Sequence, residues 1–103
     1  MVMAAEIADT RRARRRGLIG RDRLVGAFVL LKCRHVHTFA LRIPIDVAMC
    51  DRDGVVLGTA SIEPRKFGPI IRHCALVVEM PLGSIDRHRI ARGDRLEIRR
   101  CAK

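Results

Sequence analysis

From Gly26 onward the chain alternates short apolar runs with turn residues, and each run has the length of a β-strand. Valine, isoleucine and leucine dominate these runs, and prolines, glycines and one Asp-Gly step separate them. Short runs bounded in this way are typical of strands. The pattern predicts strands, in order, at Ala27–Lys32, His35–Ile43, Ile45–Cys50, Val55–Ile62, Cys74–Met80 and Arg95–Arg99.

The segments between these runs contain turn signals and two short helical signals. The Asp51–Gly54 turn lies between two β-branched runs and predicts a hairpin, because glycine accepts the positive φ of a tight turn. Glu63–Arg72 holds two prolines and four charges, and it predicts a loop. Arg11–Arg16 is expected to form a short solvated helix, and Ser84–Ile90 a single helical turn.

Six short strands with little helix predict a mainly β fold, a compact antiparallel sandwich or barrel with one or two short helices. The 103 residues suit a single domain over 1–103. Apolar residues make up 49% of the chain but aromatic residues only 3%, so we expect an aliphatic core. The chain shows no signal peptide and no apolar run long enough for a membrane span, which predicts a cytoplasmic location.

The chain is strongly basic, with 21 lysines and arginines against 11 acidic residues and a formal charge of +10. The excess lies toward the two ends, where Arg11–Arg16 and Arg87–Arg100 form a candidate phosphate-binding surface. With only three phenylalanines as aromatic residues, such binding to nucleic acid is expected to be unspecific. A GC-rich genome is the alternative explanation, since asparagine and glutamine are absent.

Motifs of catalysis and cofactor binding are not found in the sequence. The four cysteines form no CxxC pair, so neither a zinc ribbon nor a thioredoxin-type motif is present, and free thiols are expected. Neither serine lies in a Gly-x-Ser-x-Gly motif, and no glycine-rich loop could cradle a phosphate. No enzyme class and no cofactor is therefore indicated.

An ordered series of short motifs resembles the domain of unknown function 192 family of bacterial and archaeal proteins. The resemblance covers about residues 8–99 and leaves 1–7 and 100–103 as terminal extensions. It implies a compact β-rich fold and no reaction, because the family has no established activity. The motifs are Gly17–Arg21, Val36–Phe39, Arg42–Val47, Asp51–Gly54, Val77–Gly83 and Gly93–Asp94.

Two positions depart from what this resemblance implies. Leu41 stands where family members commonly have methionine, and Ala40 where many have tryptophan. An aromatic platform for a ligand is therefore missing at this point of the chain.

The main candidate site is a polar cluster of His37, Thr38, Arg42 and Asp46. An imidazole, a hydroxyl, a guanidinium and a carboxylate that converge on a shallow pocket would bind a small anion or a sugar. The alternative is structural, with a buried pair of Arg42 and Asp46 holding the turn around Pro44.

Glu79 is a carboxylate within an apolar strand and needs a partner, because burying an unpaired charge is very unfavourable. Arg21, which also lies in a family-like motif, is the expected partner. Both residues are included among the candidate ligand-binding residues, although structural pairing is favoured over catalysis.

Cys33, His35 and His37 form a weak candidate metal site. Alternate residues of a strand share a face, so the thiol and both imidazoles would point the same way. Asp46 or His73 would then supply a fourth ligand. The alternative is a row of polar residues on a half-exposed strand.

Three functional hypotheses remain open at this point. The first is a small non-enzymatic accessory or ligand-binding module that uses the His37–Asp46 cluster. The second is an electrostatic binder of nucleic acid or of an acidic partner through the arginine-rich ends. The third is a metal-dependent or hydrolytic enzyme.

Overall fold

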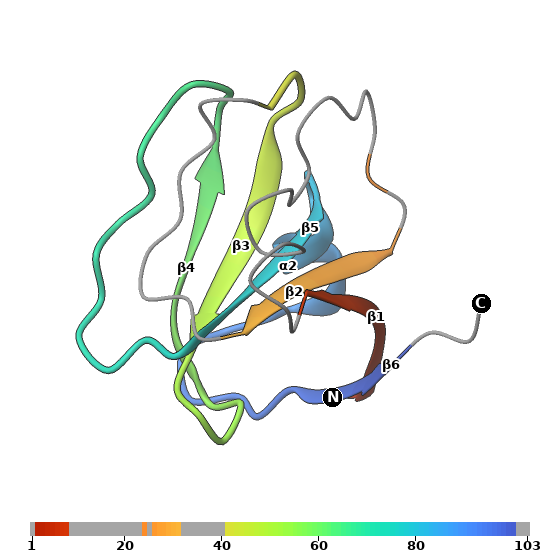
Figure 1. The fold of residues 1–103 in the computed structure, drawn as a ribbon, viewed down its shortest axis with the longest axis vertical. Coiled ribbons are helices and arrows are strands. Elements are labelled where there is room, and N and C mark those ends of the chain that lie inside the picture. Colours follow the sequence, from red (N-terminus) through yellow and green to blue (C-terminus); the bar gives the residue numbers. More distant parts are fainter. Residues whose placement is uncertain (1, 9–23, 25, 32–40, 101–103) are drawn as a thin grey trace.

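The computed structural model describes residues 2–8, 24, 26–31 and 41–100. They form one six-stranded sheet and one short helix, so the predicted mainly β fold is confirmed (Figure 1). The elements are β1 (Val2–Ala8), β2 (Ala27–Leu31), β3 (Ile45–Cys50), β4 (Val56–Ile62), β5 (Leu76–Pro81), α2 (Ser84–His88) and β6 (Glu97–Arg100).

Most of the predicted elements are found within a few residues of their expected bounds. The Asp51–Gly54 turn joins β3 to β4 as the hairpin signal predicted, and 63–72 is a loop. The predicted strand over His35–Ile43 is only partly testable, since 41–43 are not strand and 35–40 lie outside the described residues. The predicted helix Arg11–Arg16 also lies outside them.

The strand order is β4-β3-β5-β2-β1-β6, and the pairing is mixed rather than wholly antiparallel. β1 pairs in parallel with both β2 and β6, whereas the pairs β2–β5, β3–β5 and β3–β4 are antiparallel. The expected all-antiparallel arrangement was wrong because Val2–Ala8, assigned to a terminal extension, is a strand inside the sheet. Its alanine-rich sequence gives little β signal.

The sheet bends round until the chain just before β6 meets the start of β4. Val56 donates its N–H to the carbonyl of Asp94 at 2.7 Å, and Leu96 donates to the carbonyl of Gly54 at 2.9 Å. Gly54 has φ +86°, and a Cβ there would lie 2.6 Å from the Leu96 carbonyl oxygen. This contact therefore requires glycine, and it closes the sheet toward a barrel.

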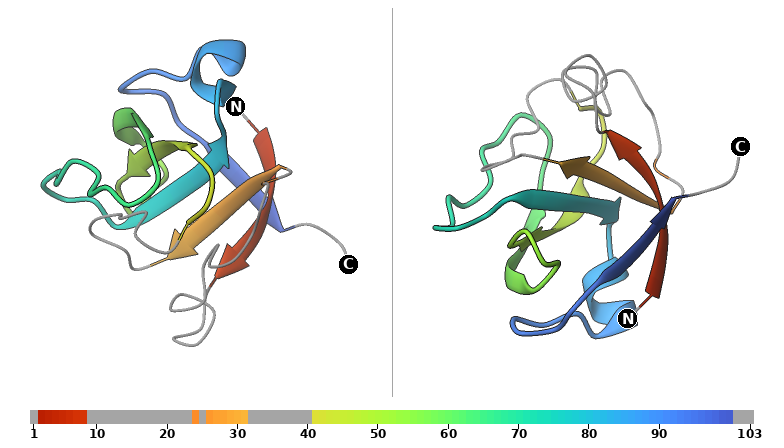
Figure 2. Two further views of the ribbon diagram at one scale, coloured as in Figure 1. Left: turned by 90° about the horizontal axis from the view of Figure 1, so that it is seen from above. Right: turned by 60° about the horizontal axis from the view of Figure 1, so that its bottom comes forward.

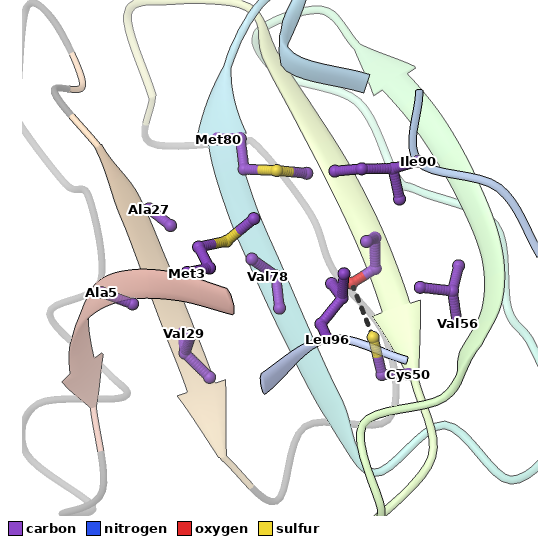
Figure 3. Close-up of a cluster of buried hydrophobic side chains, with 11 residues drawn as sticks. Met3, Ala5, Ala27, Val29, Cys50, Val56, Val78, Met80, Ile90 and Leu96 are labelled. Carbon is purple, nitrogen blue, oxygen red and sulfur yellow. Dashed lines mark hydrogen bonds between the residues drawn. The ribbon is translucent and has the colours of Figure 1, made fainter. Parts of the chain in front are cut away.

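Apolar side chains are buried on both faces of the sheet, and all six residues of β3 are buried. The cluster between the bent strands and the residues that follow α2 is shown in Figure 3. It contains Met3, Ala5, Ala27, Val29, Ala48, Cys50, Val56, Val78, Met80, Ile90 and Leu96. The second cluster, on the other face, contains Leu24, Phe28, Leu41, Ile45, Val47, Met49, Ile62, Cys74 and Val77.

Two irregular segments project from this framework, as Figure 2 shows from two further directions. The loop 63–73 follows β4 and returns to β5, and the segment 89–96 links α2 to β6. Both carry several cationic side chains, which bear on the candidate site.

Candidate functional site

Asp46 lies on β3, is only 2% exposed, and its carboxylate binds two other elements of the fold. Ser61 of β4 donates its hydroxyl to Oδ1 at 2.7 Å, and the N–H groups of Gly83 and Ile85 each donate to Oδ2 at 3.0 Å. Gly83 is the N-cap of α2 and has no side chain to offer the first amides of the helix. Asp46 therefore supplies that cap from the sheet and fastens α2 to it.

Arg42, the neighbouring member of the predicted cluster, is exposed. The hydrogen bonds of Asp46 go to Ser61, Gly83 and Ile85, so the buried pair of Arg42 with Asp46 considered as a structural alternative is not formed. Arg42 is exposed whereas Asp46 is buried, so the guanidinium and the carboxylate do not form one site. His37 and Thr38, the other two members, lie outside the described residues, and their role stays a prediction.

Glu79 occupies the middle of β5 and is only 3% exposed. In the sheet register it lies beside Phe28 of β2 and Val47 of β3, so it shares a face with apolar neighbours. Within the described part of the chain, no buried side-chain nitrogen or oxygen lacks a hydrogen-bond partner, so its carboxylate is satisfied. Arg21, its predicted partner, lies outside the described residues.

The described residues offer no support for the predicted metal site. No group of three or more histidine, cysteine, aspartate and glutamate side chains that could hold a metal ion is found among them. Cys33, His35 and His37 lie outside them, so that proposal stays untested. Of the two fourth ligands considered, Asp46 accepts three hydrogen bonds, and His73 is exposed in a turn with φ 68°.

Cys50 and Cys74 are buried free thiols. Burial raises the pKa of Cys50 to about 12, with the nearby Cys74 adding to the effect, and burial also raises the pKa of Cys74. A thiol that stays protonated at neutral pH is a poor nucleophile and a poor metal ligand. These two cysteines are therefore part of the core rather than of a reactive site.

Exposed basic side chains come from three segments that adjoin or contact β4, two of them its neighbours in the sequence. We call this set the β4 basic surface: the exposed residues Arg52, Arg65, Lys66, Arg72, Arg92 and Arg95. The β3–β4 turn contributes the first, the loop 63–73 the next three, and the segment 89–96 the last two. Of these segments, only the last was included in the candidate surface predicted from sequence.

The β3–β4 turn adjoins β4 directly, and contacts hold the other two segments against the strand or the residue before it. Gly93 donates its N–H to the carbonyl of Val56 at 2.8 Å, and Val55 and Arg95 form an antiparallel bridge. Ile71 packs over Gly58, two residues further along β4. Figure 1 shows the loop leaving the end of β4 and returning along its outer side.

Four carboxylates lie within the same segments and reduce the local charge. Asp51 accepts the N–H groups of Asp53 and Val55 on Oδ1, and Asp94 accepts the N–H of Ala91, so these two carboxylates stabilise turns. Asp53 and Glu63 are exposed. The six cations still outnumber the four acids, so this surface is moderately rather than strongly basic.

The arginine-rich end predicted from sequence is also exposed. Arg87, Arg89 and Arg99 point to solvent, on α2, after it and on β6. Arg99 lies 3.5 Å from Glu97, and both side chains are mostly exposed, so this pair contributes little to stability. We group these arginines as a second basic region, defined by α2 and β6 rather than by β4.

A comparison with known families matches residues 1–98 to the model of DUF192, described as Uncharacterized ACR. The chain belongs to the DUF192 family. The resemblance inferred from its motifs is thereby confirmed, and the match also includes β1. No curated protein matches the chain.

Two solved structures share the fold. One is a protein of unknown function from Novosphingobium aromaticivorans DSM 12444, with 23% identity, a TM-score of 0.78, and coverage of 88% of this chain and 71% of that chain. The other is a candidate transcription regulator from Sinorhizobium meliloti 1021, with 22% identity, a TM-score of 0.75, and coverage of 88% and 78%. At these identities, the similarity shows the fold alone.

The described residues contain one helix, α2, which can be compared with the requirements of a membrane-spanning helix. It has neither the length nor the apolar character that crossing a membrane requires.

Proposed function

We propose that this DUF192 protein is a non-catalytic module that binds nucleic acid through the phosphate contacts of its β4 basic surface. One observation carries the proposal: Arg52, Lys66, Arg92 and their neighbours are exposed around a single strand. Two of the four acids in these segments, Asp51 and Asp94, accept backbone N–H groups in turns, and the six cations outnumber all four acids.

The proposed binding is weak and strongly dependent on salt. Each phosphate that a cation neutralises releases counterions, which gives a slope of about −0.9 per contact when log K is plotted against log salt. Exposed acids such as Asp53 and Glu63 oppose part of the attraction. We therefore expect about three or four effective contacts, with a slope near −3.

The remaining features agree with a binding role in a reducing compartment. Cys50 and Cys74 are free thiols, which favours the cytoplasm. The name of the S. meliloti structure is a reason to test nucleic acid first, although fold similarity at 22% identity transfers no function. No residue is assigned a catalytic role.

The test is fluorescence anisotropy of a labelled DNA duplex titrated with the full chain at two salt concentrations. The double variant Lys66→Ala/Arg72→Ala removes two charges from the β4 basic surface and should weaken binding about tenfold at low salt. The matched control Arg87→Ala/Arg99→Ala removes the same charge from the other basic region and should change binding less than threefold. Both pairs are exposed, so the fold is expected to be unaffected.

Two results would overturn the proposal. Affinity that hardly changes with salt would exclude phosphate contacts as its source. An equal loss in both double variants would mean that only net charge matters, and a larger loss in the control would assign binding to α2 and β6 instead.

The second candidate function is the binding of a small anion by the predicted cluster of His37, Thr38 and Arg42, of which Arg42 is exposed. A ligand that binds only the native state raises the melting temperature. A thermal-shift titration with inorganic phosphate should therefore raise the melting temperature of the native chain more than that of Arg42→Ala. Equal shifts would exclude Arg42 from such a site.

A further inference from the structure

The loop 63–73 presents two large apolar side chains to solvent. Phe67 is 70% exposed and Ile70 is 86% exposed. The loop turns at both ends through residues with positive φ, Arg65 at 63° and His73 at 68°. Conformations of this kind are uncommon for residues other than glycine and occur often at functional sites.

Ile71 fixes the direction in which the tip of the loop points. A Cβ built on Gly58 would lie 2.4 Å from Cδ1 of Ile71, so this side chain occupies the space above the glycine. Met49 of β3 lies beside the same position. With Ile71 packed on the sheet, the neighbouring Ile70 is directed outward.

Cationic side chains flank the two apolar ones on both sides. Lys66 precedes Phe67, Arg72 follows Ile71, and both cations are exposed. A flat aromatic face between positive charges suits a nucleic acid whose bases are unpaired, because bases stack on the ring while the cations contact the phosphates. A duplex keeps its bases stacked inside and could use only the cations.

We infer that Phe67 and Ile70 receive an unpaired base, which gives the β4 basic surface a preference for single strands over duplexes. This inference rests on the proposed function. Phe67 stacks on the face of the base, and Ile70 packs against its edge. Lys66 and Arg72 hold the phosphates on either side.

Other partners fit these observations less well. Two apolar side chains provide far less area than the roughly 800 Å² that each partner of a stable protein complex contributes. An anionic bilayer would also attract apolar and cationic groups together. The tip belongs to a loop and not to an amphipathic helix with a long apolar face, so we favour nucleic acid, and vesicle binding is one outcome of the test.

The experiment compares anisotropy titrations of a short labelled oligothymidylate and of a duplex of equal length. Stacking contributes about 1–3 kcal/mol per base, so Phe67→Ala should weaken oligothymidylate binding about tenfold and duplex binding less than twofold. Phe67→Tyr keeps the ring and should restore single-strand affinity. Leu82→Ala removes an apolar side chain that is 52% exposed elsewhere on the surface, and it should change neither affinity.

Separate outcomes identify which proposal fails. Salt-dependent binding that Phe67→Ala leaves unchanged, or weakens equally for both probes, overturns the role of the loop and leaves the proposed function standing. A native chain that binds neither probe overturns the proposed function itself. A third outcome assigns the tip to lipid and also overturns the inference. In that case the native chain sediments with phosphatidylserine vesicles but does not bind oligothymidylate, and Phe67→Ala and Ile70→Ala abolish the sedimentation.

Discussion

Replacing Asp46 tests whether this carboxylate is a structural group, as its three hydrogen bonds indicate. In Asp46→Ala, the N–H groups of Gly83 and Ile85 lose their acceptor, and Ser61 loses its partner. A buried donor left unsatisfied costs about 1–3 kcal/mol. Because the two amides are partly buried, we expect a total loss of about 2–4 kcal/mol in the free energy of unfolding.

Asp46→Asn separates the geometry of the site from its charge. The amide oxygen can still accept the two backbone N–H groups while the amide nitrogen donates to Ser61. Only the charge assistance is lost, so the expected cost is about 1 kcal/mol. For a domain of this size, 1 kcal/mol corresponds to about 4–8 °C in melting temperature.

Urea unfolding followed by circular dichroism measures both variants, with Asp53→Ala as the control. Asp53 is an exposed carboxylate on the β3–β4 turn, and its removal should change stability by less than about 0.5 kcal/mol. The reasoning is refuted if Asp46→Ala is as stable as the control, or if Asp46→Asn is the less stable of the two. Either result would mean that the three hydrogen bonds of Asp46 do not contribute to stability as argued.

Three further predictions concern the core. In urea unfolding, Gly58→Ala should lower the free energy of unfolding by about 1–3 kcal/mol, because the new methyl group meets Ile71. Part of this loss should be recovered when Ile71 is also shortened to valine. An unchanged free energy of unfolding would contradict the packing. Cys50 should resist iodoacetamide in the native chain near pH 8 and react after denaturation, as peptide mass spectrometry would show; rapid native labelling would contradict its burial. The pKa of Cys50 is about 12 in the folded chain against 9.0 for an ordinary thiol. The folded chain therefore keeps a proton that the unfolded chain releases above pH 9, so the free energy of unfolding should fall as the pH rises from 9 to 12. This fall should be smaller in Cys50→Ala.

The hairpin and the central strands could be predicted because their signals are local. Asp51–Gly54 places glycine where the chain needs φ +86°, and the aliphatic run Ile45–Cys50 is buried along its whole length. The strand Val2–Ala8 could not be recognised in this way. Its alanines pack in the core only because β2 and β6 lie on either side, and that pairing depends on residues far away in the chain.

The candidate site shows the same division between local and distant information. The sequence marked Asp46 as a polar residue in a family-typical motif but gave no means of finding its partners, which lie 15 to 39 residues further along the chain. A buried aspartate that caps a distant helix and an aspartate that binds a ligand have the same local pattern. The hydrogen bonds of the folded chain distinguish them.

Only part of the β4 basic surface could be predicted, for a related reason. The segment 89–96 belongs to the predicted basic end, whereas the β3–β4 turn and the loop 63–73 have acids among their cations and do not stand out from the composition of the chain. The three segments become one surface because Gly54 allows the Leu96 carbonyl to approach closely and because Gly58 leaves space for Ile71. A Cβ at Gly54 would meet a backbone carbonyl and should displace the segment 89–96, so the proposed binding should weaken together with the packing. At Gly58 a Cβ would meet the end of the Ile71 side chain, which can shift, so the effect on the proposed binding should be smaller.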